Sequence, residues 1–197
     1  MEIEEVAAAA TTKRPPILKN HVRILRVNEY EILREKARTL QNQTRLDTLL
    51  LTGLRYVEAQ RLHDHPDWFD GDFLNLPDYA VKKAKRKQKE RSVRLNPRGL
   101  SVLPYFFKGK NLPSWKSWTQ DLKRWAVWGN VDPTGLSPKT TRKTWESWLV
   151  CTYSEKHPYD VFLSQGHTEA TSMRHYMNLP FTPEDKLAMQ RWVAGWI

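Results

Sequence analysis

Arg55 and Glu58 are the first residues whose types and spacing could do chemistry. Arg55 comes two residues after Gly53, and glycine commonly ends a helix, so Arg55 would lie at the start of the next helix. The free backbone N–H groups at such a start also attract an anion. Glu58 follows three residues later on the same helix face, where its carboxylate could hold the Arg55 guanidinium in place. The pair is a candidate phosphate-binding element, although an ordinary surface ion pair has the same spacing.

Lys139 and Arg142 form a second candidate. They follow Ser137-Pro138, a pattern that predicts a helix start with Ser137 as the N-cap. A spacing of three residues puts both cations on one face of the first turn, where they could grip one phosphate, with the arginine giving paired hydrogen bonds. Cations are unfavourable at the positive end of a helix dipole, which favours a functional reason for them.

A basic run at residues 82–91 is the strongest charge feature of the sequence. Seven of its ten residues are Lys or Arg. Strand patterns on both sides predict a hairpin with fixed ends, whose tip could reach a groove or a phosphate of DNA or RNA and make binding salt-dependent. A solvated hairpin or a localisation signal would have the same composition. The residues expected to contact nucleic acid are Lys82, Lys83, Arg86, Lys87, Lys89 and Arg91.

His167 and Tyr176 stand nine residues apart near the end of the chain, and His167 follows a glycine. By itself, a single histidine or tyrosine is more often structural than catalytic. His63 and His65 could suggest a metal site, but no further His or Cys clusters with them in the sequence. They therefore predict a loop, and we expect no metal and no cofactor.

Composition limits the class of protein. The 197 residues suffice for one domain with a real core, and 32 Lys and Arg against 22 Asp and Glu give a net charge of +10. This excess favours an anionic polymer or surface as the partner. Nine Trp and 40% hydrophobic residues exclude a disordered basic tail, and a single cysteine, Cys151, excludes an intramolecular disulfide. No apolar run approaches ~18 residues and the N-terminus lacks the charge order of a secretory signal, so we expect no membrane association.

The elements that must position these residues are mostly helical. Apolar spacing predicts helices at 24–40, 45–52, 55–65, from 115, from 137, and at 159–164, 168–176 and 183–197. The patterns DFLNLP and RSVRLNP predict two short strands around the basic run. Thr182 is expected to cap the last helix, with Leu187, Trp192 and Trp196 as its apolar positions. The predicted fold class is mainly α with a small antiparallel β-sheet (α+β).

Taken in order, these motifs resemble the catalytic domain of the tyrosine recombinase (integrase) family. The matching stretches are TGLRYVEAQRL at 52–62, KERSVRL at 89–95, KTTR at 139–142 and QGHTEATSMRHY at 165–176. Each motif alone is weak, but their order and spacing are specific, and the resemblance covers residues 43–181.

The resemblance implies a site-specific DNA recombinase that forms a covalent 3′-phosphotyrosyl intermediate without ATP or metal. It makes Tyr176 the nucleophile and Arg55 and Arg142 the phosphate-binding arginines. His167 would hydrogen-bond the scissile phosphate, and Glu58 would orient the catalytic groups. Lys85 is the expected general acid that protonates the leaving 5′-oxygen.

Two assignments stay open within this resemblance. Lys87 competes with Lys85, because the basic run is one residue longer than the family pattern leads us to expect. The family's second box usually reads His-x-x-Arg, whereas here Lys139 occupies the histidine position. Lysine occurs there in relatives from archaeal viruses and plasmids, and it accepts a proton poorly near neutral pH unless its pKa is depressed. The base that accepts the Tyr176 proton is therefore undecided.

The resemblance also implies partners and domain limits. We expect double-stranded DNA attachment sites as the partner, self-assembly into a tetrameric synapse, and a nucleoid-associated location in the cytoplasm of a prokaryotic host. The predicted domains are a tail or linker at 1–20, a catalytic domain at 21–181 and a C-terminal helix at 182–197, packed in cis or on a neighbouring protomer. About 40 residues precede the first motif, which favours an excised catalytic fragment over a minimal single-domain enzyme. A type IB topoisomerase and a non-catalytic DNA- or RNA-binding module are the alternatives.

Overall fold

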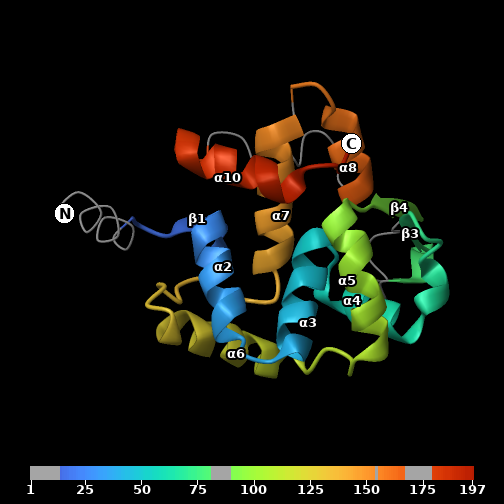
Figure 1. The fold of residues 1–197 in the computed structure, drawn as a ribbon, viewed down its shortest axis with the longest axis horizontal. Helices are drawn as coiled ribbons and strands as arrows, with labels where there is room; N and C mark the ends of the chain where they lie inside the picture. Colours follow the sequence, from blue (N-terminus) through green and yellow to red (C-terminus); the bar gives the residue numbers. More distant parts are fainter. Residues whose placement is uncertain (1–13, 81–89, 154, 167–178) are drawn as a thin grey trace, which may run out of the picture.

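The computed structural model describes residues 14–80, 90–153, 155–166 and 179–197 (Figure 1). Their helices are α2 (Val27–Lys36), α3 (Leu40–Leu51), α4 (Tyr56–Asp64), α5 (Pro97–Lys108), α6 (Trp115–Trp128), α7 (Thr140–Tyr153), α8 (Pro158–Gln165) and α10 (Pro183–Val193). Two short 3₁₀ turns, η2 (Pro66–Trp68) and η3 (Asp78–Ala80), flank strand β3 (Phe73–Leu76). The fold is mainly helical with two small antiparallel sheets, which confirms the predicted class.

Helix α7 lies at the centre of the molecule and packs against β2, α3, α8 and α10 (Figure 1). Trp145, Trp148 and Leu149 are fully buried on it, as their spacing predicts. Its buried residues are nearly continuous from Thr140 to Val150, so they lie on all sides of the helix, which agrees with its central place. Arg142 lies in its first turn, so the central helix of the fold positions this side chain.

The two sheets are both two-stranded hairpins. Strands β3 and β4 (Arg91–Arg94) pair antiparallel with Leu76 opposite Arg91, which confirms the two strands predicted around the basic run. Strands β1 (Ile17–Lys19) and β2 (Val22–Ile24) form the second hairpin, with Ile17 buried. This hairpin differs from the tail predicted for residues 1–20. Strands of three residues show too little alternation to be recognised in a sequence.

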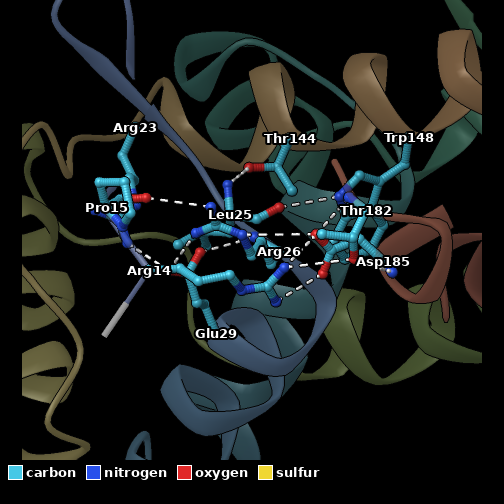
Figure 2. A network of polar contacts seen from close by, with 10 residues as sticks. All are labelled: Arg14, Pro15, Arg23, Leu25, Arg26, Glu29, Thr144, Trp148, Thr182 and Asp185. Atoms are coloured by element: carbon cyan, nitrogen blue, oxygen red, sulfur yellow. Dashed lines mark hydrogen bonds and ion pairs between the residues drawn. The ribbon is translucent and has the colours of Figure 1, made fainter. Parts of the chain in front are cut away.

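Helix α10 begins with a capping box. The Thr182 hydroxyl accepts the Asp185 N–H at 3.3 Å, and the Asp185 carboxylate accepts the Thr182 N–H at 3.0 Å, so Thr182 caps the helix as predicted. Figure 2 shows that Asp185 also binds the N-terminal segment, because both terminal nitrogens of Arg14 donate to it at 2.8 and 2.9 Å. Arg26 adds a second link, donating to the Pro15 carbonyl at 3.2 Å with its Nε 3.7 Å from Asp185.

The C-terminal helix packs in cis in this structure. Tyr153 of α7 donates its hydroxyl to the Val193 carbonyl at 2.9 Å, and the Trp196 indole donates to the Arg94 carbonyl of β4 at 3.0 Å. The Asn96 amide donates to the Trp192 carbonyl at 2.7 Å. Helix α10 is therefore tied to α7 and to the strand that carries Arg91.

Four local expectations were wrong. The first helix starts at Val27 rather than at residue 24, because Val22–Ile24 pair with β1. Leu40 does not end that helix but begins α3, with 69% of its surface exposed, and Leu187 on α10 is 55% exposed. The helix expected from Ser137-Pro138 begins at Thr140, after a turn in which the Thr140 N–H bonds to the Ser137 carbonyl at 2.9 Å.

We predict that Asp185→Ala lowers the free energy of unfolding by about 2 kcal/mol, because it removes a helix cap and the anchor of Arg14. Chemical denaturation measures this change. The matched control is Gln190→Ala, which truncates an exposed polar side chain on the same helix. Equal losses in the two variants would contradict the role assigned to the carboxylate.

Candidate phosphate-binding site

Glu58 is a fully buried carboxylate held between two arginines. It lies in the first turn of α4, where one of its oxygens accepts the Arg55 backbone N–H at 2.8 Å and the other accepts Nη1 of Arg55 at 2.6 Å. From β4, both terminal nitrogens of Arg91 donate to the same carboxylate at 3.0 and 2.8 Å. One carboxylate thus fixes a guanidinium from its own helix and one from a strand 33 residues away.

The charge state of Glu58 follows from these contacts. Burial by itself would raise the pKa of the carboxyl, but the hydrogen bonds and charge of Arg91, then the charges of Arg55 and Arg142, hold it well below its ordinary value. Burial lowers the pKa of Arg91, and Glu58 opposes that shift. Three guanidinium groups therefore lie within electrostatic range of one buried anion.

Arg142 is held by three acceptors from three different elements. Its Nη1 donates to the Gly53 carbonyl at 2.7 Å, its Nη2 donates to the Gln165 carbonyl at the end of α8, and its ion pair with Glu146 measures 2.8 Å. The residue is 8% exposed. This arrangement fixes the planar guanidinium next to the loop that leads into Arg55.

Two glycines allow this close packing. Gly53 ends α3 with φ of +59°, and a Cβ at this position would lie 2.3 Å from the Gln165 side-chain oxygen and 2.9 Å from Cδ1 of Trp145. Gly166 ends α8 with φ of +65°, and a Cβ there would lie 2.9 Å from Cδ of Arg91. Both positions need a residue that adopts positive φ and has no side chain. The prediction that Gly53 ends a helix is confirmed.

The sequence-derived site residues fall into two groups. The structure brings Arg55, Glu58 and Arg142 together, whereas Lys139 lies exposed just before the first residue of α7. The other predicted residues, His167, Tyr176, Lys82, Lys83, Lys85, Arg86, Lys87 and Lys89, lie outside the described residues.

Arg91 differs from the exposed DNA contact that the sequence predicts. Its side chain is 7% exposed, and both of its terminal nitrogens bind Glu58. Residues at the base of a hairpin face the core as often as the solvent, so composition alone could not separate Arg91 from the rest of the basic run.

Sequence reasoning missed the three groups that hold Arg142, which are the Glu146 carboxylate and the Gly53 and Gln165 carbonyls. Glu146 stands four residues after Arg142 on α7, a spacing that could have revealed the pair. The Gln165 carbonyl could not have been found, because a backbone acceptor leaves no signature in residue types.

Across the described ranges, no cluster of three His, Cys, Asp or Glu side chains is arranged to hold a metal ion. The helices of these ranges include none long and apolar enough to cross a membrane.

No protein-family model matches the sequence, and no curated protein matches it. Solved structures match it at the level of the fold. The crystal structure of XerA recombinase superposes with a TM-score of 0.61 at 15% identity, over 92% of this chain and 67% of that one. The chain has the catalytic-domain fold of tyrosine recombinases.

A second match supports the same fold. The Tn1549 transposon integrase in complex with circular intermediate DNA gives a TM-score of 0.58 at 16% identity, over 92% of this chain and 69% of that one. The same integrase in complex with transposon right-end DNA gives a TM-score of 0.58 at 16% identity, over 96% of this chain and 70% of that one. The tyrosine recombinase fold therefore accounts for nearly the whole chain.

We predict that Glu58→Gln lowers the free energy of unfolding at neutral pH by about 3 kcal/mol, because it removes the counter-charge of a buried arginine. Since the folded-state pKa of Glu58 is depressed, its stabilisation is complete above the unfolded pKa of ~4.3 and is lost as pH falls below it. The wild-type protein should therefore lose more stability than Glu58→Gln on acidification. Denaturation at several pH values measures both effects.

The control is Glu35→Gln, which removes a carboxylate whose side chain is 71% exposed. An unfolding free energy of Glu58→Gln equal to that of this control at neutral pH would show that Glu58 is not the counter-charge of the arginines.

Proposed function

We propose that this chain is the catalytic domain of a site-specific DNA recombinase of the tyrosine recombinase class. One observation carries the proposal: Arg55 and Arg142, which the motifs assign to the phosphate, come from separate elements and lie close together. Arg55 binds the buried carboxylate of Glu58, and Arg142 donates to the Gly53 carbonyl, two residues before Arg55, while its charge acts on the same carboxylate. The fold shared with recombinase and integrase domains supports the same conclusion.

The chemistry assigned to the site is transesterification at phosphorus. After a base has taken the Tyr176 proton, the phenolate oxygen attacks the scissile phosphodiester, a Tyr O–P bond forms, and the bond from phosphorus to the 5′-oxygen breaks. Lys85 or its rival Lys87 gives a proton to that leaving oxygen. The phosphotyrosine conserves the energy of the broken phosphoester bond, so a 5′-hydroxyl from a partner strand can reverse the step and rejoin the DNA without ATP.

The arginines act on the charge that develops in this step. Arg55 and Arg142 would bind the non-bridging oxygens, and a guanidinium already fixed by carboxylate and carbonyl acceptors needs little reorganisation when charge builds up. His167 would donate to the same phosphate. Surrounding cations would also lower the pKa of the Tyr176 phenol from ~10 and favour attack by the phenolate.

The proposal extends to partners. The DNA bound in the Tn1549 integrase structures supports duplex DNA attachment sites as the substrate of this chain. We place the protein on DNA in a prokaryotic cytoplasm, assembled as a tetrameric synapse. Lys139 in the second box favours a mobile element of the archaeal virus and plasmid branch.

We predict that wild-type protein incubated with supercoiled plasmid and quenched with SDS carries covalently linked DNA, whereas Tyr176→Phe binds DNA but forms no adduct. Peptide mapping of the adduct identifies the nucleophile. Cleavage by Tyr176→Phe would refute the assignment of Tyr176. Salt-sensitive binding by the wild type with no adduct, on plasmid and on a nicked attachment site, would favour a non-catalytic binding module. Relaxed plasmid without recombinants would point to a type IB topoisomerase.

We also predict that Arg142→Ala slows adduct formation at least about a hundredfold, because it removes a preorganised donor to the transition state. A time course of trapped complex measures the rate. Arg124→Ala serves as the control, since it removes an arginine whose side chain is 54% exposed on α6. A loss below about tenfold in Arg142→Ala that still folds would show that Arg142 does not bind the phosphate.

A further inference from the structure

The β1–β2 hairpin brings a third lysine to two that flank Arg142 in the sequence. Lys139 and Lys143 stand four residues apart, on one face of the start of α7, with the Lys143 N–H bonded to the Lys139 carbonyl at 3.1 Å. The Lys143 ammonium reaches across to the hairpin and donates to the Lys19 carbonyl at 2.8 Å. Lys19, Lys139 and Lys143 are called the hairpin lysines below.

The hairpin is fixed where it meets α7. The Arg23 N–H donates to the Gly135 carbonyl at 2.9 Å, and a Cβ at Gly135 would lie 2.6 Å from Cδ2 of Leu18. The turn residues Asn20 and His21 both have positive φ, 50° and 60°, as a two-residue hairpin turn requires. The tip therefore projects at a set position beside the start of α7, with Asn20, His21 and Lys139 exposed.

The charges of the hairpin lysines oppose one another. Burial lowers the pKa of the Lys143 ammonium, Glu146 partly offsets this, and the charges of Lys139 and Lys19 lower it further. Glu146 is itself paired with Arg142. Bringing like charges together is unfavourable unless an anion joins them, and a row of phosphates supplies such anions at regular spacing.

A purely structural role explains only part of this arrangement. The bond from Lys143 to the Lys19 carbonyl joins hairpin to helix, and it requires neither the Lys19 nor the Lys139 ammonium. Lys139 stands three residues before Arg142 and four before Lys143, so it connects the phosphate-binding arginine to the hairpin.

We propose that the hairpin lysines form a contact surface for the backbone of duplex DNA, adjoining the phosphate held by Arg55 and Arg142. In Figure 1 strand β1 and the β3–β4 pair lie on opposite sides of α7, so this surface is separate from strand β4. The inference rests on the proposed function in taking DNA as the ligand, but it does not depend on cleavage.

The test is the salt dependence of DNA binding, measured in the Tyr176→Phe background so that no covalent complex forms. Fluorescence anisotropy with a labelled duplex between about 50 and 200 mM salt gives the slope of log K against log salt concentration. Lys19→Gln removes one charge and keeps the backbone carbonyl that Lys143 binds. We expect it to reduce the magnitude of the slope by about 0.9 and Lys19→Arg to restore it, as for one lost phosphate contact.

Lys186→Gln is the matched control. Lys186 is exposed on α10, and its charge acts on Cys151 near the end of α7. Cys151 follows Lys139 by 12 residues, or about 18 Å along the helix, so Lys186 lies far from the hairpin lysines. An unchanged slope in Lys19→Gln, or an equal decrease in Lys186→Gln, would overturn the proposal, because only net charge would then matter. If the wild type traps DNA covalently but Lys19→Gln leaves the salt slope unchanged, the proposed DNA contact of the hairpin lysines is rejected and the recombinase function is kept. A reduced slope in a protein that never forms an adduct would keep the surface and reject the recombinase.

Discussion

The arrangement of the site depends on the burial of one carboxylate. Glu58 is the anion that lets Arg55 and Arg91 approach each other, and its charge also acts on Arg142. Without it, three guanidinium groups would repel one another in a region with little access to water. An enzyme that binds a phosphate through arginines needs those arginines in place before the phosphate arrives, and a buried counter-charge provides this while leaving the cluster positive.

Strand β4 connects the arginine cluster to α8 and to the C-terminal segment. It carries Arg91, its Arg94 N–H donates to the Ser164 hydroxyl of α8 at 3.1 Å, and its Arg94 carbonyl accepts the Trp196 indole. The next residue, Gln165, supplies the carbonyl that accepts a hydrogen bond from Arg142. The C-terminal segment packed in cis therefore supports the same strand that supports the arginines, so displacement of α10 onto another protomer would remove a contact from the frame of the site.

The sequence predicts local elements well and long-range pairings poorly, and a repeated motif shows why. Arg26 and Glu29 have the same spacing as Arg55 and Glu58, and in both pairs the glutamate accepts the arginine N–H at 2.8 Å. Each glutamate also binds a second arginine, Arg23 at Glu29 and Arg91 at Glu58. Arg23 stands six residues from Glu29, whereas Arg91 stands 33 residues from Glu58. Spacing could identify both helix starts, as it identified Gly53 and Thr182, but the long-range pairing that distinguishes the second start arises from the fold.

Charge balance shows why the proposed binding of DNA needs cations outside the arginine cluster. Among the side chains described around Arg142, the carboxylates Glu58 and Glu146 are both engaged by arginines. Three arginines against two carboxylates leave about one positive charge at the arginine cluster, which is small beside the charge of a DNA backbone. Attraction over a longer range must come from cations placed outside the buried cluster. Lysines suit that place, because a hydrated ammonium on a flexible stem can follow a phosphate without the fixed geometry that the buried arginines require.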